Sequence, residues 1–365
     1  MTSSKIFVIL FFALVFAACS SDEKDGANLP SASGRTGDMF IIIDSIQRKG
    51  PLGDALNSIF NAEMAGLPRD ESIFHVNWID PRKLNFVLKQ RRNLIFAVSL
   101  DQSSSGATYI KNLFTEESVE KIKSDSAFFV RTVPNVFAKG QEVMYLFGNT
   151  QEQLIKNINK NSKQLVDHFN NTEKERLTKS LLKAGQVKGV SDFLRKNFEC
   201  DIKAPFGYKL ADKNGEFLWM RQINPKDDKD IFIARKPYRS QDQFRADSLI
   251  SFRDQICKKY LFEDPAMTDS YLMTETTIPF LQVSTTPITF NGHYAVEMRG
   301  LWRTNNKSMG GPFVGYALVD EAKGIFYYIE GFTFSPGKTQ REIMRELEAI
   351  LFTFRVSSEL SKTGS

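Results

Sequence analysis

Apolar and polar positions in the first half of the chain predict strands alternating with helices. The run from Met39 to Ile43 is continuously apolar, as in a strand buried on both faces, whereas Phe74 to Trp78 alternates as a half-exposed strand does. The predicted strands cover residues 38–43, 74–78, 93–100 and 142–147. The predicted helices cover residues 52–65, 80–90, 118–123 and 150–184, the last interrupted at 170–171.

Strand patterns dominate the second half of the chain. The dipeptides Asn214-Gly215 and Asn291-Gly292 favour tight hairpins between the strands that flank them. The predicted strands cover residues 207–211, 217–222, 230–235, 280–290, 293–303, 313–319 and 324–334. The predicted helices cover residues 191–199, 241–260 and 339–354. Antiparallel hairpins with helices at either end predict an α+β fold.

The pattern divides the chain into two α+β lobes, each expected to be a mostly antiparallel sheet covered by helices. The first lobe is predicted to span residues 38–185 and the second residues 190–356. Residues 19–37 carry almost no large apolar side chain, which predicts a flexible tether, and residues 357–365 are expected to form a disordered tail.

Two matches within the chain predict that one lobe duplicates the other. Residues 148–155 (GNTQEQLI) match residues 337–344 (GKTQREIM), and in each a Thr is followed three positions later by Gln or Glu, as in a capping box. Residues 38–41 (DMFI) match residues 230–233 (DIFI). The order strand, helix, further strands, strand, capped helix therefore occurs twice.

The first eighteen residues have the pattern of an export signal. Lys5 precedes an apolar run over residues 6–18, which as a helix would rise only ~20 Å and fall short of the ~30 Å hydrocarbon core of a membrane. The small residues Ala17 and Ala18 before Cys19 resemble a bacterial lipobox, in which the Cys becomes the lipidated N-terminus, although Phe16 replaces the usual Leu. An ordinary secretory signal with an incidental thiol is the alternative.

Lipidation at Cys19 would anchor the protein in the lipid bilayer, because two or more acyl chains suffice for stable attachment. The acidic stretch over residues 20–25 (SSDEKD) resembles an export signal of surface lipoproteins, so we expect an outer-membrane protein that is either periplasmic or surface-exposed. Cleavage before Cys19 removes one charge and lowers the net charge from +5 to +4. Basic and acidic residues are interspersed, which argues against a nucleic-acid partner.

Two cysteines remain after the lipidated one. An exported protein lies in an oxidising compartment, so Cys200 and Cys257 can pair as a disulfide. The alternative, which we favour, is two separately buried thiols, since free Cys packs as a small hydrophobe.

Few residues suggest catalytic or metal chemistry. His75, His168 and His293 have no second His or Cys three or four positions away, so we expect no metal site and no cofactor. We expect His75 and His293 to be ordinary polar side chains at exposed positions. Dispersed carboxylates can pair in space as in a glycosidase, but spacing along the chain does not indicate it.

A predicted loop after the strand 293–303 is the best candidate for partner binding. It combines aromatic, basic and amide side chains at the end of a strand, where recognition residues often lie. The candidate residues are Arg299, Trp302, Arg303, Asn305 and Asn306. The alternative is that Trp302 belongs to the core and the loop is merely long.

As a whole, the chain resembles a family of uncharacterised Bacteroidota lipoproteins described only as a domain of unknown function. The resemblance rests on the lipobox, the FIIID strand, the GxTQ helix starts and the segment GIFYYIEGFTF. The second lobe is distantly similar to the PsbP-type sandwich. Neither resemblance implies an activity or a catalytic residue.

Two functions are compatible with these observations. The first is a membrane-anchored, non-catalytic binding or structural protein whose partner is an unknown envelope protein or glycan. The second is an envelope hydrolase that acts on glycan or peptide through dispersed carboxylates.

Overall fold

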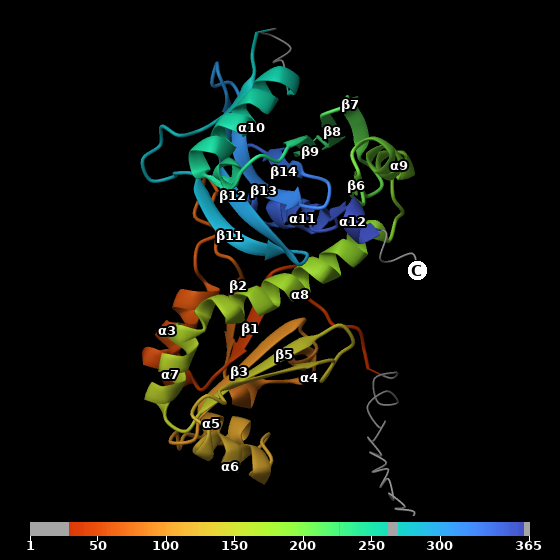
Figure 1. Ribbon diagram of the computed structural model, residues 1–365. Coiled ribbons are helices and arrows are strands. Elements are labelled where there is room, and N and C mark those ends of the chain that lie inside the picture. Colours follow the sequence, from red (N-terminus) through yellow and green to blue (C-terminus); the bar gives the residue numbers. More distant parts are fainter. Residues whose placement is uncertain (1–28, 226, 262–268, 361–365) are drawn as a thin grey trace, which may run out of the picture.

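The protein has two lobes, and the helix α8 (Ser162–Leu182) runs along both of them (Figure 1). The computed structural model describes residues 29–225, 227–261 and 269–360. Cys19 and the predicted export signal lie outside these residues. The α+β fold with two lobes is confirmed.

The sheet of the first lobe is mostly parallel. Its order is β2-β1-β3-β5-β4, and only the edge strand β4 runs antiparallel to its neighbour. The strands are β1 (Asp38–Ile42), β2 (His75–Ile79), β3 (Asn93–Ser99), β4 (Val130–Pro134) and β5 (Glu142–Gly148). All of β3 is buried, as expected for a parallel strand covered on both faces. The expectation of a mostly antiparallel first lobe is therefore wrong.

Two groups of helices cover this sheet. On one face α3, α7 and α8 enclose a core that contains Ile41, Ile95 and Phe169; on the other face a second core contains Phe96 and Ile110. The helical segments are α2 (Ser45–Arg48), α3 (Pro51–Phe60), η2 (Pro81–Lys83), α4 (Phe86–Lys89), α5 (Ser105–Lys111), α6 (Glu116–Ser124) and α7 (Gln151–Lys160).

The second lobe contains a long antiparallel sheet in the order β10-β12-β13-β14-β9-β8-β7, with β11 paired to β12. The predicted meander of four strands is confirmed as β11 to β14, joined by short turns. The strands are β7 (Lys209–Lys213), β8 (Phe217–Ile223), β9 (Asp228–Pro237), β10 (Leu272–Thr274), β11 (Ser284–Phe290), β12 (His293–Thr304), β13 (Gly310–Asp320) and β14 (Ile325–Phe334).

Both faces of this sheet are buried, which separates the two cysteines. One core contains Cys200 and α11, the other contains Cys257 and α10. Both thiols are free and buried on opposite faces, so the alternative of two separate thiols is confirmed. The remaining elements are α9 (Lys188–Asn197), β6 (Cys200–Asp201), η3 (Gln241–Phe244), α10 (Ala246–Tyr260), α11 (Arg341–Leu351), β15 (Arg355–Val356) and α12 (Ser357–Leu360).

The predicted duplication is wrong. A parallel sheet in one lobe and an antiparallel meander in the other cannot superpose strand for strand. The two GxTQ segments also differ: Thr150 accepts a hydrogen bond from the Gln153 backbone at 3.3 Å, whereas α11 begins after Gln340 without a side-chain cap of its own. The matches reflect common helix-start sequences.

The helix break lies earlier than predicted. Helix α7 ends at Lys160, and α8 begins at Ser162 and continues unbroken through residues 170–171. Thr172 does not cap a new helix, because its hydroxyl donates to the carbonyl of His168 at 2.9 Å, within α8.

Both segments expected to be flexible are partly ordered. Ser31 and Ser33 form isolated bridges to Lys139 and Arg91, so residues 31–33 of the predicted tether lie on the first lobe. At the other end, α12 forms within the predicted tail, and Glu359 pairs with His293 at 2.6 Å.

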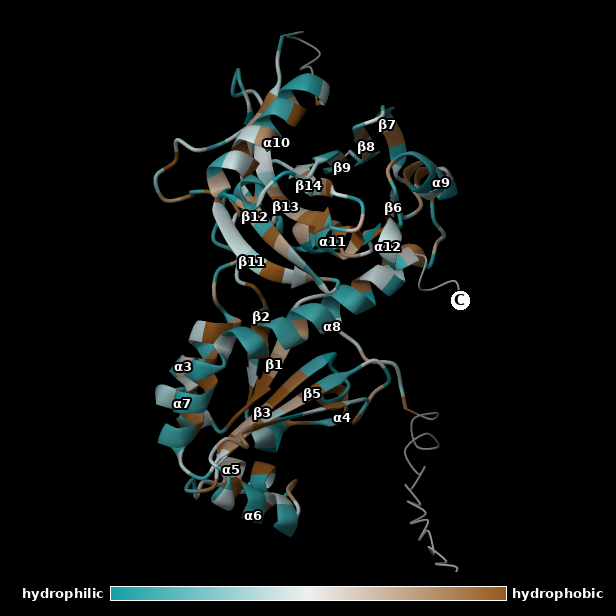
Figure 2. Cartoon of the chain, in the orientation of Figure 1, coloured by the Kyte–Doolittle hydropathy of each residue, from teal (hydrophilic) through white to brown (hydrophobic). Residues whose placement is uncertain are grey.

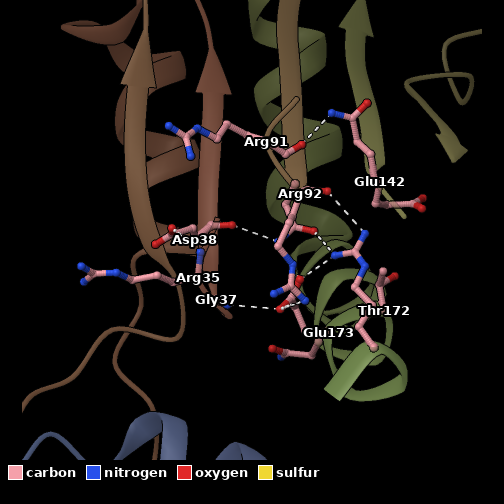
Figure 3. A network of polar contacts seen from close by, with 12 residues as sticks. Arg35, Gly37, Asp38, Arg91, Arg92, Glu142, Thr172 and Glu173 are labelled. Carbon is pink, nitrogen blue, oxygen red and sulfur yellow. Dashed lines mark hydrogen bonds and ion pairs between the residues drawn. The ribbon is translucent and has the colours of Figure 1, made fainter. Parts of the chain in front are cut away.

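A buried carboxylate fixes α8 to the first lobe. Figure 3 shows Glu173 directed at Gly37 and Arg92. Its oxygens lie 3.0 Å from the Asn93 amide, 3.3 Å from Arg92 and 2.5 Å from Arg176. Glu173 is 1% exposed, so this network holds α8 against the beginnings of β1 and β3.

The two lobes are joined through α11. Glu71 of the first lobe accepts hydrogen bonds from the backbone N–H groups of Gln340 at 2.6 Å and Arg341 at 2.9 Å, where the helix would otherwise leave donors unpaired. Arg345 donates to the carbonyl of Ile73 at 2.6 Å, and Thr178 of α8 donates to the carbonyl of Ala349 at 3.1 Å.

We predict that Glu71→Ala lowers the free energy of unfolding by about 1–2 kcal/mol, because it leaves two helix N-terminal donors without their cap. Urea unfolding measures the loss. Asp70→Ala is the matched control, since Asp70 is exposed and adjacent. Equal stabilities of the two variants would contradict the capping role.

Candidate functional site

A cleft of about 840 Å³ lies between the lobes, where β11 passes over α8 (Figure 1). One wall is α8, the opposite wall is β11, and the loop over residues 63–65 of the first lobe lines it as well. Residues of α11 and the following Phe352 complete the lining. This volume is in the range of ligand sites.

The cleft-facing side of α8 is mostly polar, although Val166 and Leu177 also line the cleft. Lys163, Asp167, Asn170, Asn171 and Lys174 line the cleft, and their spacing of three and four residues places them on one side of the helix. Figure 2 shows α8 as mostly hydrophilic, in contrast to the hydrophobic β1. The wall therefore offers amides and charges to a ligand.

An arginine between two carboxylates forms part of the cleft surface. Arg299 of β12 donates to both oxygens of Glu297, at 2.8 and 2.9 Å, and to Glu348 of α11 at 2.9 Å. Burial opposes the charge on Arg299, but Glu348 and Glu297 outweigh burial and raise its pKa. Burial also opposes ionisation of Glu348, but Arg299, with smaller contributions from Lys174 and Arg345, lowers the pKa of this carboxyl.

Lys174 is a cleft cation without an ion-pair partner among the residues that the structure describes. Arg345 has no ion pair there either, but its guanidinium donates to the Ile73 carbonyl and to Asn170. The ammonium of Lys174 lies 3.2 Å from the ring centroid of Phe352, a cation–π contact. Burial lowers the pKa of Lys174 from 10.5 to about 8, and the distant carboxylate of Glu348 only partly offsets it. An incoming anion would find a half-buried, poorly solvated positive charge here.

Arg345 connects the cleft to the lobe interface. Besides the carbonyl of Ile73, its guanidinium donates to the side-chain oxygen of Asn170 at 3.1 Å. This bond orients the Asn170 amide on the cleft wall. The cleft is thus built from both lobes and from α8.

The cleft carboxylate Glu348 does not have the properties of a general acid. Glu348 has a lowered pKa and so stays ionised, whereas a general acid of a glycoside hydrolase needs a raised one. Two histidines form carboxylate pairs, His168 with Glu142 at 2.8 Å and His293 with Glu359. Over residues 29–225, 227–261 and 269–360, no three His, Cys, Asp or Glu side chains gather as metal ligands.

Trp302, a candidate for partner binding, is not exposed. Trp302 is 2% exposed, packs against Phe332, and donates its indole N–H to the carbonyl of Thr333 at 3.3 Å. Both faces of the sheet are covered, so the side chain is buried in the core shared with α10. The alternative that Trp302 belongs to the core is confirmed.

The other candidate residues do not form one surface. Arg299 lines the cleft, whereas Arg303 pairs with Glu275 at 2.7 Å beside a separate hollow of about 340 Å³. Asn305 accepts from the Tyr271 backbone at 2.9 Å, and Asn306 accepts from Ser308. The predicted long loop is a tight turn over residues 305–309 between β12 and β13.

Sequence reasoning missed Lys174, Glu348 and the β11 edge. Lys174 lies on a polar helix face that looks like a solvated surface, and nothing local to the sequence shows that another lobe covers it.

In the part of the chain that the structure describes, no helix is both long and apolar enough to span a membrane. His75 is exposed, as predicted.

Two family descriptions match the chain. Residues 188–353 match a domain of unknown function (DUF4837), and residues 32–182 match another domain of unknown function (DUF8532). The expectation of an uncharacterised family is confirmed at this coarse level. No curated protein matches the chain.

Among solved structures, the chain is similar to a point mutant of the protein Mog1, with 9% identity, a TM-score of 0.28, and coverage of 44% of this chain and 91% of that one. The Ran-binding protein Mog1p of Saccharomyces cerevisiae matches with 8% identity, a TM-score of 0.28 and coverage of 44% and 90%. A Bacteroides thetaiotaomicron protein matches with 8% identity, a TM-score of 0.23 and coverage of 43% and 45%. These similarities carry no functional argument.

We predict that Lys174 makes stability depend on pH. Between its folded pKa of about 8 and its ordinary 10.5, the unfolded chain binds more protons at this amine, so the free energy of unfolding rises with pH in that window. Urea unfolding of the protein and of Lys174→Met, from about pH 7 to about pH 10.5, isolates this contribution. A difference between the two proteins that does not change with pH would contradict the shifted pKa.

Proposed function

We propose that this chain is a non-catalytic binding protein of the bacterial envelope, attached to the outer membrane by a lipid on Cys19. Its partner is an envelope protein or glycan, which it binds in the cleft between the lobes. The observation that carries the proposal is the open cleft in which Arg299 is held by two carboxylates while Lys174 has no carboxylate partner among the described residues.

Pre-organised charges support binding. Arg299 is fixed by Glu297 and Glu348, and Asn170 is fixed by Arg345, so little side-chain freedom remains to be lost when a ligand enters. Lys174, which forms no ion pair with a residue that the structure describes, supplies a charge that a ligand can complement.

The hydrolase alternative lacks a supporting observation among the described residues of the cleft. It needs a carboxylic acid that stays protonated at neutral pH beside a second carboxylate. In the cleft, Glu297 and Glu348 both accept hydrogen bonds from Arg299, and Arg299 lowers the pKa of Glu348, which favours the ionised form of that carboxyl.

The lipid anchor follows from the N-terminal sequence. Residues 20–28 separate Cys19 from the first described residue, Leu29, and the stretch from Cys19 to Leu29 would reach at most ~35 Å when extended. A lipidated Cys19 would therefore keep both lobes and the cleft close to the membrane surface.

We predict that Cys19→Ala abolishes membrane fractionation, because it removes the atom that carries the acyl chains. Immunoblots of membrane and soluble fractions measure the distribution, and Ser20→Ala is the matched control. Recovery of Cys19→Ala with the membranes at the unmodified level would exclude the lipid anchor.

We predict that a photoreactive amino acid at Asn171 crosslinks the partner in intact envelopes, since Asn171 is an exposed residue of the cleft. The same substitution at Glu175 is the control, because Glu175 is exposed on α8 but does not line the cleft. Mass spectrometry identifies the adduct as peptide or glycan. Equal yields at both positions would contradict the cleft as the binding site.

A further inference from the structure

The cleft exposes a free strand edge. Strand β11 pairs with β12 on one side only, and residues 284–289 of β11 are half-buried or exposed. Ser284 and residues 286–289 line the cleft. The unpaired side of this strand therefore borders the cavity, which Pro287 and Thr289 line, whereas Thr285 is not among the lining residues.

The register defines which backbone groups point outward. Asn291 and Gly292 both have positive φ, so they form a two-residue hairpin turn that makes Phe290 and His293 a hydrogen-bonded pair. Bonded and non-bonded pairs alternate along an antiparallel ladder. The backbone groups that point away from β12 are consequently those of Thr285, Pro287 and Thr289.

These outward groups are available to a ligand. Thr285 and Thr289 each present an N–H and a C=O, and Pro287 presents only a C=O, which gives five groups. Among the described residues none of them has a backbone or side-chain partner. A Pro at an outward position is compatible with an edge strand because the ladder to β12 needs no N–H there.

The wall opposite the edge completes a groove. Asn171 and Lys174 of α8 line the same cleft as β11, so the groove has a strand edge on one side and a polar helix face on the other. An extended peptide can join such an edge as an additional strand, with its main chain bonded to the edge and its side chains read by the helix.

Resting on the proposed function of the cleft, we propose that its ligand is an extended polypeptide segment that adds as a strand to β11 and places a carboxylate on Lys174. The five outward groups of Thr285, Pro287 and Thr289 bind the peptide backbone. The ammonium of Lys174, which has no carboxylate within ion-pair distance among the described residues, binds the carboxylate of an acidic side chain or of the peptide C-terminus.

A random decapeptide library displayed on phage, selected on the intact chain, provides the probe peptides. We expect the selected peptides to be enriched in Asp, Glu or a free C-terminus. Affinity is then measured by fluorescence anisotropy of one selected peptide and of its amidated or Gln-substituted form. Failure to select any peptide would overturn the proposal.

The double variant Thr285→Pro/Thr289→Pro removes the two outward N–H groups together with the threonine side chains, and it leaves the N–H groups that face β12 unchanged. We expect the affinity of the selected peptide to fall about tenfold or more, because two backbone hydrogen bonds are lost. Thr285→Val/Thr289→Val changes the same side chains, keeps both N–H groups and is expected to bind as the unmodified chain does. Equal affinity of the Pro and Val variants, both with unmodified melting temperatures, would overturn strand addition.

Lys174→Gln tests the carboxylate contact. We expect it to weaken the acidic peptide about tenfold and to leave the affinity of the Gln or amidated peptide unchanged. Equal losses for both peptides would overturn the role of Lys174. If the adduct at Asn171 is a glycan, the cleft remains the binding site and the peptide proposal fails; if Asn171 gives no specific adduct and no peptide is selected, both fail.

Discussion

The cleft depends on one contact, in which the carboxylate of Glu71 in the first lobe accepts backbone N–H groups at the start of α11 in the second. A helix N-terminus combines unpaired donors with the positive end of the helix dipole, so a carboxylate supplied from outside binds there with a defined direction. Arg341 reaches back to the carbonyl of Ser72 at 3.0 Å, and Arg345 to that of Ile73. Each lobe thus completes the hydrogen bonding of the other, which fixes the distance between α8 and β11.

The buried charges have a positional role. Two opposite charges lose their hydration when they are buried. Their mutual attraction compensates for this loss only when their geometry is good and further hydrogen bonds form. Glu173 meets this condition on the first-lobe side, with two arginines and an amide, and Arg299 meets it in the second lobe with two carboxylates. Lys174 lies on α8 between these clusters with a ring as its contact, and no carboxylate among the described residues lies within ion-pair distance of it, so a ligand can still neutralise its charge.

Local signals in the sequence were sufficient for the meander of the second lobe, because hairpins such as the one at Asn291-Gly292 are specified by adjacent residues. They could not specify the first sheet, since β1, β3 and β5 pair across long stretches of chain. The candidate site also depends on contacts between residues that are distant in the sequence, so local signals could not specify it. Arg299 and Trp302 lie three residues apart on β12 and so point to opposite faces, and only the packing of α10 and α11 decides which face is cleft and which is core.

The composition of β11 explains why its edge is suited to a ligand instead of a second copy of the same strand. Proteins commonly protect a free edge with Pro, and Pro287 takes this place at an outward position. If the β11 edges of two copies met, the carbonyl acceptors would outnumber the N–H donors, because each edge presents three carbonyls and two N–H groups. A different segment with a full set of N–H groups can satisfy all three carbonyls. The residue that limits self-association therefore still permits binding of an extended peptide, and the cleft beside α8 leaves room for it.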